Sequence, residues 1–218
     1  MFNGIIKEVG IIKSINSEEG QGSVISLIKT FIITASNNIT QKPIGASIAV
    51  DGVCLTITAK TTDSFQVVAM PETLSRTICG TYQIGAKVNL ETPMQLGEDI
   101  SGHPVLGHVD TMGEILNIEG DEKSKIFEIS FSKEIAKYLA FKGSICLNGI
   151  SLTVSKLKTE SLQVSIIPHT LENTNLNSLK KGDSVNIEVD MFARYLERLI
   201  ETKDSQVKYE YLQERGFL

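Results

Sequence analysis

Short apolar runs with polar residues alternating through them fill most of the chain. Six such runs in its first part are rich in β-branched residues and short enough to be strands. They are GIIKEVGIIKSI, SVISLI, SIAV, VCLTITA, SFQVVAM and KVNLE. About six short strands per hundred residues favour a small closed barrel, because closure leaves few exposed strand edges.

The same pattern then recurs. GASIAVDGVCLTIT begins at Gly45, and KGSICLNGISLTVS begins 97 residues later, at Lys142. Residues 70–91 match residues 167–188 at the same offset, whereas GIIKEVG from Gly4 matches GHVDTMG from Gly107 at an offset of 103. The first copy therefore carries about six extra residues, which we place within SINSEEGQGSVISLIKTF. Two copies are too few for a solenoid, so we predict two similar domains, 1–96 and 97–189.

Turn and helix signals fall at matching places in the two copies. Asp51-Gly52 and Asn148-Gly149 lie between apolar runs and suit type I′ hairpin turns, in which both central residues need a positive φ. PETLSRT and PHTLENT each predict a short helix with proline in its first turn, and SKEIAKYLA (132–140) predicts another.

The last segment, 190–218, has no counterpart after the first copy. Its apolar residues recur at helical spacing and predict a C-terminal helix. That helix packs either on its own barrel or on a partner subunit, and the stripe alone leaves both open. The stripe consists of Phe192, Tyr195, Leu196, Leu199 and Ile200.

Composition narrows the function classes. The formal net charge is −5 and no block of Lys or Arg stands out, which argues against a nucleic-acid partner. No apolar run is long enough for a membrane span, and MFNGIIKEVG lacks the features of a signal peptide. Three cysteines without a CxxC pair argue against structural zinc or a disulfide framework, and for the reducing cytoplasm.

One predicted strand in each copy carries small polar residues that could take part in binding or catalysis. Cys54 and Thr56 alternate with Leu55, so they share a strand face, as Ser151 and Thr153 do in the second copy. Small polar groups on one face can hydrogen-bond a planar heterocycle. The alternative is that Cys54 is a small buried residue and the hydroxyls merely fit a pleated surface. His103, His108 and His169 lie in different contexts without zinc-ligand spacing, so each is by default a surface or core-satisfied histidine.

Taken together, the motifs resemble the riboflavin synthase family over nearly the whole chain. MFNGII, SIAVDGVCLTIT, VNLE, SGHPVLGHVD, KGSICLNGISLTV, IPHTL and VNIEVD occur in order in a duplicated frame. The resemblance implies two tandem six-stranded antiparallel Greek-key barrels related by pseudo-two-fold symmetry, with a C-terminal α-helix (190–218) that holds a homotrimer. It implies that two molecules of 6,7-dimethyl-8-ribityllumazine react by four-carbon transfer. The products are riboflavin and 5-amino-6-(D-ribitylamino)uracil, and no cofactor or metal takes part.

The implied reaction accounts for the internal repeat of the sequence. Donor and acceptor are the same compound, so two similar pockets are expected, one in each copy. Their roles differ, so the pockets should differ too, and Cys54 against Ser151 is where they do. Holding two rings face to face supplies about 7–11 kcal/mol through effective concentration. General acid–base groups add to this.

Carried over by position, the resemblance implies two sets of substrate-binding residues. The N-terminal pocket comprises Gly4, Ile5, Ile6, Cys54, Leu55, Thr56 and the passage from Val68 through Met70, Pro71 and Glu72 to Thr73. The C-terminal pocket comprises His103, Pro104, Val105, Ser151, Leu152, Thr153, Ser165, Ile166, Ile167, Pro168, His169 and Thr170. Lys142 would approach the ligand of the first pocket.

The candidate catalytic residues are five polar members of these sets together with two further positions, Ser47 and Asp190. They are Ser47, Cys54, Thr56, His103, Ser151, Thr153 and Asp190. In the family the working site lies between the N-terminal barrel of one subunit and the C-terminal barrel of another. Association with lumazine synthase, the capsid-forming enzyme that makes the substrate, stays an open alternative.

The chain departs from the family pattern at four places. Asn3 replaces a usual Thr, Ser101 replaces a Gly, Arg76 is shifted by one position, and Asn148 stands where Asp is common. A second function therefore remains in view, that of the non-catalytic lumazine- or flavin-carrying fluorescent proteins, which are monomers with one chromophore. A flavin-binding barrel from a reductase is a third, against which the lack of a nucleotide-binding domain argues.

Overall fold

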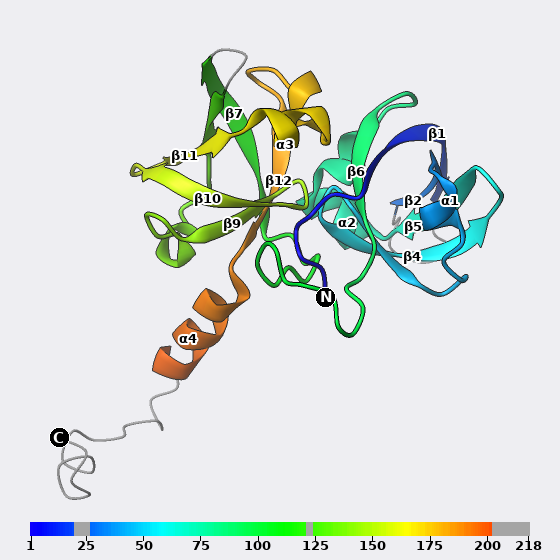
Figure 1. Cartoon of the computed structure of the whole chain (residues 1–218), viewed down its shortest axis with the longest axis horizontal. Helices are drawn as coiled ribbons and strands as arrows, with labels where there is room; N and C mark the ends of the chain where they lie inside the picture. Colours follow the sequence, from blue (N-terminus) through cyan, green and yellow to red (C-terminus); the bar gives the residue numbers. More distant parts are fainter. Residues whose placement is uncertain (20–26, 121–123, 202–218) are drawn as a thin grey trace, which may run out of the picture.

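Two closed six-stranded antiparallel barrels form the body of the protein, as the alternating strand pattern predicts. The computed structural model describes residues 1–19, 27–120 and 124–201. The first barrel runs β1-β2-β5-β4-β3-β6 and the second repeats that Greek-key order. The barrels lie side by side (Figure 1).

The strands of the first barrel are β1 (Glu8–Glu19), β2 (Leu27–Thr34), β3 (Ser47–Val50), β4 (Val53–Lys60), β5 (Ser64–Ala69) and β6 (Lys87–Glu91). Those of the second are β7 (Thr111–Gly120), β8 (Lys125–Ser130), β9 (Ser144–Leu147), β10 (Ile150–Leu157), β11 (Ser161–Ile166) and β12 (Ser184–Val189). β1 begins 103 residues before β7, whereas β3 begins 97 residues before β9. The extra residues of the first copy therefore lie between β1 and β3.

The helices are short apart from the last. They are α1 (Asn37–Thr40), α2 (Pro71–Arg76), α3 (Pro168–Glu172) and α4 (Met191–Glu201), with 3₁₀ turns η1 (Ile78–Thr81), η2 (Ala136–Tyr138) and η3 (Asn175–Ser178). Proline at the start of α2 and of α3 occupies a position whose N–H has no helical acceptor, as predicted.

Two sequence predictions need correction. The run 23–28 was expected to form the second strand, but β2 extends over Leu27–Thr34, and residues 20–26 lie outside the described part. Phe31 and Ile33 are buried and draw this longer segment into the core. The predicted helix 132–140 is only the turn η2, because buried Ile135 and Leu139 pin both of its ends to the barrel.

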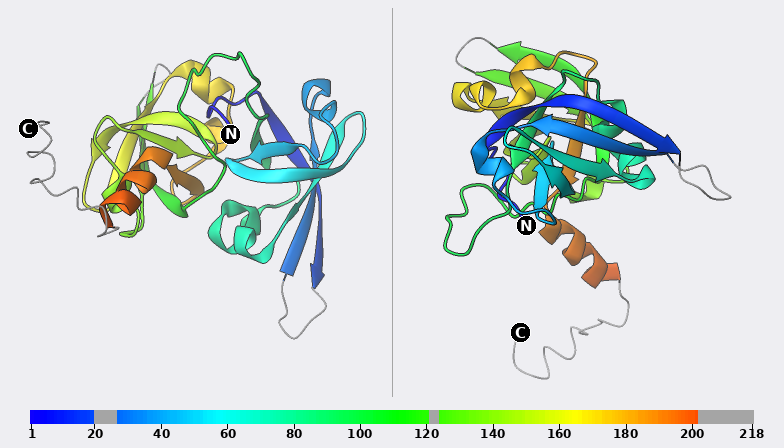
Figure 2. Two further views of the ribbon diagram at one scale, coloured as in Figure 1. Left: turned by 90° about the horizontal axis from the view of Figure 1, so that it is seen from below. Right: turned by 90° about the vertical axis from the view of Figure 1, so that its right-hand side faces the viewer.

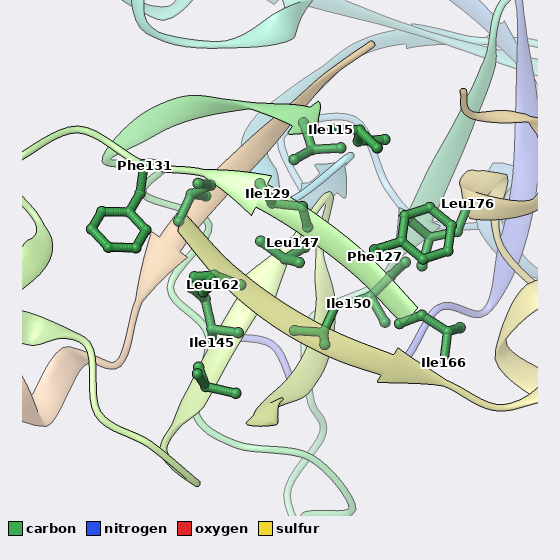
Figure 3. Packing of buried hydrophobic residues seen from close by; sticks show 14 of the residues in the cluster. Ile115, Phe127, Ile129, Phe131, Ile145, Leu147, Ile150, Leu162, Ile166 and Leu176 are labelled. Carbon is green, nitrogen blue, oxygen red and sulfur yellow. The ribbon is translucent and has the colours of Figure 1, made fainter. Parts of the chain in front are cut away.

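Each barrel encloses its own apolar core. In the second barrel, aliphatic and aromatic side chains from all its strands meet at the centre (Figure 3). Phe127, Ile129, Leu147 and Leu162 are among those with almost no exposed surface. Burial of each such side chain contributes roughly 1.5–3 kcal/mol relative to its exposed state. The alternate residues of the strands face outward, where a binding surface can form.

The two predicted hairpin turns meet each other between the barrels. Asp51 and Asn148 both have a φ of 45°, and the glycines that follow have positive φ as well. A Cβ on Gly52 would lie 2.6 Å from the backbone nitrogen of Gly149. Only glycine allows this approach, so the turns mark the pseudo-two-fold axis.

Asparagines tie the two turns together reciprocally. The Asn89 side chain donates to the carbonyl of Asn148 at 2.9 Å, and Asn186 donates to the carbonyl of Asp51 at 2.8 Å. The Asp51 carboxylate accepts further bonds from Tyr82 and Asn175 and is fully enclosed. Burial raises the Asp51 pKa to about 7.

This carboxyl makes stability depend on pH. Its pKa is about 7 in the fold against 3.8 in the unfolded chain, so the unfolded chain loses the proton first. Stability should therefore fall by an amount on the order of a few kcal/mol as pH rises from about 4 to about 7. Urea unfolding at about pH 5 and about pH 8 measures this slope. Asp51→Asn, the side chain that the second turn already carries, should reduce the slope, leaving the smaller dependence that other buried carboxyls contribute. An unchanged slope would contradict the account.

Candidate functional site

Two short segments cross between the barrels before each enters its own. The N-terminus lies between the barrels (Figure 1 and the left view of Figure 2). There Phe2 and Val105 form an isolated antiparallel bridge, with N···O distances of 2.7 and 3.0 Å. Both side chains are buried in a small cluster with Ala49 and Cys146. The segments diverge from this bridge toward opposite barrels.

Each segment then lies on the candidate strand of the other barrel. The Gly107 carbonyl accepts a bond from the Cys54 N–H at 2.9 Å, and the Gly4 carbonyl accepts one from the Ser151 N–H at 2.8 Å. Both glycines have positive φ, and a Cβ on either would come within 2.7 Å of the Cβ of Cys54 or Ser151. Gly4 and Gly107, which the repeat offset of 103 makes equivalent, therefore each lie on the barrel of the other copy.

A buried glutamate holds each crossing segment. Glu91 at the end of β6 accepts from the N–H groups of Asn3 and Gly4 at 2.7 and 3.1 Å. Glu188 in β12 accepts from three consecutive N–H groups, those of residues 106–108, at 2.8–3.1 Å. Burial raises the pKa of both carboxyls, that of Glu91 to about 7, while the backbone donors oppose the rise.

A cavity of about 340 Å³ opens beside Cys54. Strand β4 supplies Cys54, helix α2 supplies Glu72, Thr73 and Arg76, and the crossing segment supplies the opposite wall. The complete lining is Val53, Cys54, Met70, Glu72, Thr73, Arg76, Thr77, Gly107, His108 and Val109. The site therefore joins parts of the chain that are distant in sequence, and its thiol is the only one of the three that is not fully buried.

The equivalent place on the second barrel holds an imidazole and a hydroxyl. His103 Nδ1 lies 2.7 Å from Ser151 Oγ, and His103 is almost completely buried. Burial lowers the His103 pKa, although the negative charge of Asp190 opposes that change. A neutral imidazole is the form that accepts a proton near pH 7. The two sites therefore differ in chemistry, with a thiol on one barrel and a hydroxyl–imidazole pair on the other.

The grouping of the crossing residues differs from the sequence prediction. Gly4, Ile5 and Ile6 were grouped with Cys54, but Gly4 lies against Ser151 and Ile6 packs on the core of the second barrel. The wall beside Cys54 is instead formed by residues 107–109. The chain crosses between the barrels after the Phe2–Val105 bridge, so a linear assignment places Gly4 and Ile6 with the wrong barrel and misses residues 107–109. The predicted grouping of His103 with Ser151 agrees with the 2.7 Å contact between them.

Several other predicted residues turn away from either site. The side chains of Leu55 and Ile166 lie in the barrel cores, and Leu152 packs against one. Val105 lies in the cluster between the barrels. Period-two alternation sends these side chains inward, so only their backbone could face a ligand.

The remaining predicted positions are dispersed over the outer faces. Thr56 and Thr153 are exposed on β4 and β10, and Ser47 pairs with Thr56 across the β3–β4 ladder. Asp190 caps α4 by accepting from the Phe192 N–H. Ser165 near the end of β11, Ile167 just before α3 and His169 within α3 are all exposed.

Lys142 lies on the second barrel, where its ammonium stands 5.5 Å from the centre of the Phe141 ring. Lys142 does not line the cavity beside Cys54 of its own chain. Its contact with a ligand there stays a prediction, and it requires the partner subunit's Cys54.

Among the residues that line the cavity, the sequence prediction missed Gly107, His108 and Arg76. The match of GIIKEVG with GHVDTMG was the signal that could have found the first two.

Helix α4 reaches the same region with its polar face. Arg194 pairs with Asp110 at 2.5 Å and donates to the carbonyl of His108 at 3.0 Å. Glu197 bonds Tyr138 and Lys137 of the second barrel. The apolar side chains remain outside these contacts, with Phe192, Tyr195, Leu196, Leu199 and Ile200 each at least 59% exposed.

Among the helices of the described ranges, none has the length and apolar character needed to cross a membrane.

A family model described as "Lumazine binding domain" matches the chain twice, over residues 3–93 and 106–190. Each match contains the strands of one barrel.

Relatives extend this similarity to the whole chain. The riboflavin synthase of Actinobacillus pleuropneumoniae is 39% identical and that of Bacillus subtilis 37% identical, each over 100% of both chains. Among solved structures, LumP complexed with 6,7-dimethyl-8-(1'-D-ribityl) lumazine superposes with a TM-score of 0.77 at 23% identity. It covers 87% of this chain and 99% of LumP, and so supports the fold. The chain belongs to the riboflavin synthase family, with one lumazine binding domain in each barrel.

Proposed function

We propose that this protein is a riboflavin synthase that converts two molecules of 6,7-dimethyl-8-ribityllumazine into riboflavin and 5-amino-6-(D-ribitylamino)uracil. The full-length similarity to riboflavin synthases carries the proposal. Two homologous but unequal sites, one per barrel, support it, since donor and acceptor are the same compound. The reaction would be the final step of riboflavin formation.

The chain's own residues suggest how the roles divide. One lumazine must lose a proton from an acidic methyl group, and the other must gain a nucleophile. The Ser151–His103 pair offers a neutral base next to a hydroxyl, with Asp190 nearby to stabilise an imidazolium. The Cys54 thiol on the other barrel offers a nucleophile or a group that orients water. Alignment of the two rings supplies much of the remaining rate.

The working assembly in this proposal is a homotrimer. The exposed apolar face of α4 is unsuited to water, and its polar face is already engaged by the second barrel. A partner subunit covering this face would place the first barrel of one chain against the second barrel of another. Lys142 would then reach a ligand beside the partner subunit's Cys54.

Mixing purified protein with the lumazine tests the function. We expect riboflavin absorbance to appear at one molecule for every two lumazines consumed, without an added cofactor. Binding of the lumazine with unchanged absorbance over hours would instead support the fluorescent carrier function. The fold neighbour LumP does not decide between these outcomes, because its 23% identity speaks to the fold alone.

The Cys54→Ser variant tests the thiol. We expect an intact fold but slower turnover, because the homologous position already carries serine and a hydroxyl ionises far less readily than a thiol. Steady-state rates, with circular dichroism as the folding check, measure the effect. Cys146→Ala is the matched control, since that thiol is buried between the barrels. Equal turnover of both variants would remove Cys54 from the mechanism.

A further inference from the structure

Two buried glutamates, Glu91 and Glu188, hold the two crossing segments, residues 3–4 and 106–108, in a symmetric arrangement. Glu91 is 2% exposed and Glu188 is 3% exposed, and both stand at the same place in the repeat, at the ends of VNLE and VNIE. Neither carboxylate touches the cavity beside Cys54. Each accepts bonds from successive backbone N–H groups of one crossing segment. Bonds of this kind to an ionised acceptor are about twice as strong as neutral ones.

The segment that each glutamate holds covers the other barrel. Glu188 belongs to the second barrel and holds residues 106–108, whose glycine lies over Cys54 of the first barrel. Glu91 belongs to the first barrel and holds Asn3 and Gly4, of which Gly4 lies over Ser151 of the second. Each glutamate therefore holds, from its own barrel, a segment that covers the other barrel.

We propose that Glu91 and Glu188 are crossed positioning residues, each of which holds from its own barrel the wall of the other barrel's site. Glu188 fixes the wall at Cys54, and Glu91 fixes the wall at Ser151. The effect on turnover rests on the proposed function, whereas the effect on the position of the walls does not.

The charges around the two carboxylates are unequal. Glu188 is faced by Arg194 from α4 and by Asp110, with Cys146 nearby, whereas Glu91 is faced by Lys7 and Cys146. Arg194 also bonds the carbonyl of His108 in the held wall. The wall at Cys54 is therefore fastened from two elements, β12 and α4. Both act on the barrel to which they do not belong.

Thiol alkylation offers a direct test, because the chain provides a matched pair of reporters. Cys54 is partly exposed under its wall, while Cys79 and Cys146 are buried. In the double variant Cys54→Ser/Ser151→Cys the accessible thiol moves to the equivalent place on the other barrel. Glu188→Gln and Glu91→Gln are then made in both backgrounds, and iodoacetamide labelling is followed by mass spectrometry.

We expect a crossed result. Glu188→Gln should accelerate labelling of Cys54 by about tenfold, the order expected when a charge-assisted bond is lost from a local opening equilibrium, and should leave the thiol introduced by Ser151→Cys unchanged. Glu91→Gln should do the reverse. General loosening would accelerate both reporters equally and overturn the proposal, as would unchanged labelling in all four proteins.

Two additions keep the test decisive. If a glutamine variant fails to fold, Glu188→Asp and Glu91→Asp keep the charge but shorten the reach, and the same crossed pattern is expected at smaller size. Turnover of the unaltered protein, with Cys54, Ser151 and both glutamates intact, separates the two proposals. Crossed labelling in the variants together with no riboflavin formation by the unaltered protein would retain the positioning role and reject the synthase function.

Discussion

Replacing Leu196 and Leu199 by glutamate should break the assembly into folded single chains. Both side chains are about 60% exposed on α4, so the change leaves the barrels intact. In the proposed trimer they would be buried, and loss of a central contact typically weakens association by about 2 kcal/mol or more. Turnover should fall with the assembly if, as proposed, the working site is shared between subunits. Light scattering after gel filtration, with activity measured on the same fractions, checks this expectation.

Ile84→Glu is the matched control for that variant. Ile84 is an apolar residue that is 68% exposed on the first barrel, so Ile84→Glu makes the same kind of substitution, with one added negative charge against two, outside α4. It should remain fully assembled and active. If the double α4 variant kept its size, or lost its assembly without loss of turnover, the shared site would be rejected. Truncation after Asp190 should repeat the result of the double variant.

Gly107→Ala should abolish most activity while the protein still folds. Its new Cβ would lie 2.6 Å from the Cys54 Cβ and 2.9 Å from the Cys54 nitrogen, so the wall of the cavity must move. Misplacement of reacting groups by about 1 Å costs about a hundredfold in rate. We expect turnover to fall by that order, and riboflavin binding at the first barrel to weaken. Steady-state kinetics and fluorescence titration measure the two effects.

Gly182→Ala separates crowding from backbone strain in this experiment. Gly182 also has a positive φ, of 92°, but its added Cβ would meet nothing within 4 Å. Alanine at this φ costs roughly 1–2 kcal/mol of stability on its own. The control should therefore lose only the part of the stability that comes from backbone strain, less than Gly107→Ala loses, and keep its turnover. Equal loss of turnover in both variants would mean that strain, rather than the wall, is responsible.

The alternating pattern was sufficient to predict the barrels, because side-chain direction in a strand follows directly from sequence position. It located β3 to β6 and their copies at the right offset. It failed for β2, where the apolar run before Leu27 drew the prediction away from Phe31 and Ile33. Helix α1 was not predicted at all, since four residues carry too little periodicity.

The candidate site was predictable only in part. Cys54 and Ser151 were identified by their place in the repeat, and the structure puts them at equivalent positions. His103 was rightly grouped with Ser151, but Gly4 was grouped with the wrong barrel and Gly107 was not assigned. Sequence similarity shows which residues are equivalent, and not which copy they touch. Glu91 and Glu188 stood within recognised motifs, but their backbone partners lie more than 80 residues away, so no local pattern indicates them.

The crossing of the first residues has a consequence for the order in which the chain takes shape during synthesis. Gly4 is translated before either barrel, but its position against Ser151 does not exist until the second copy has been translated. Domains generally fold as they emerge, N-terminal first. The first barrel can therefore close while its leading segment remains undocked and the Glu91 carboxylate awaits its backbone partners. This segment is therefore made before the first barrel but reaches its final position after it, on the surface of the completed second barrel.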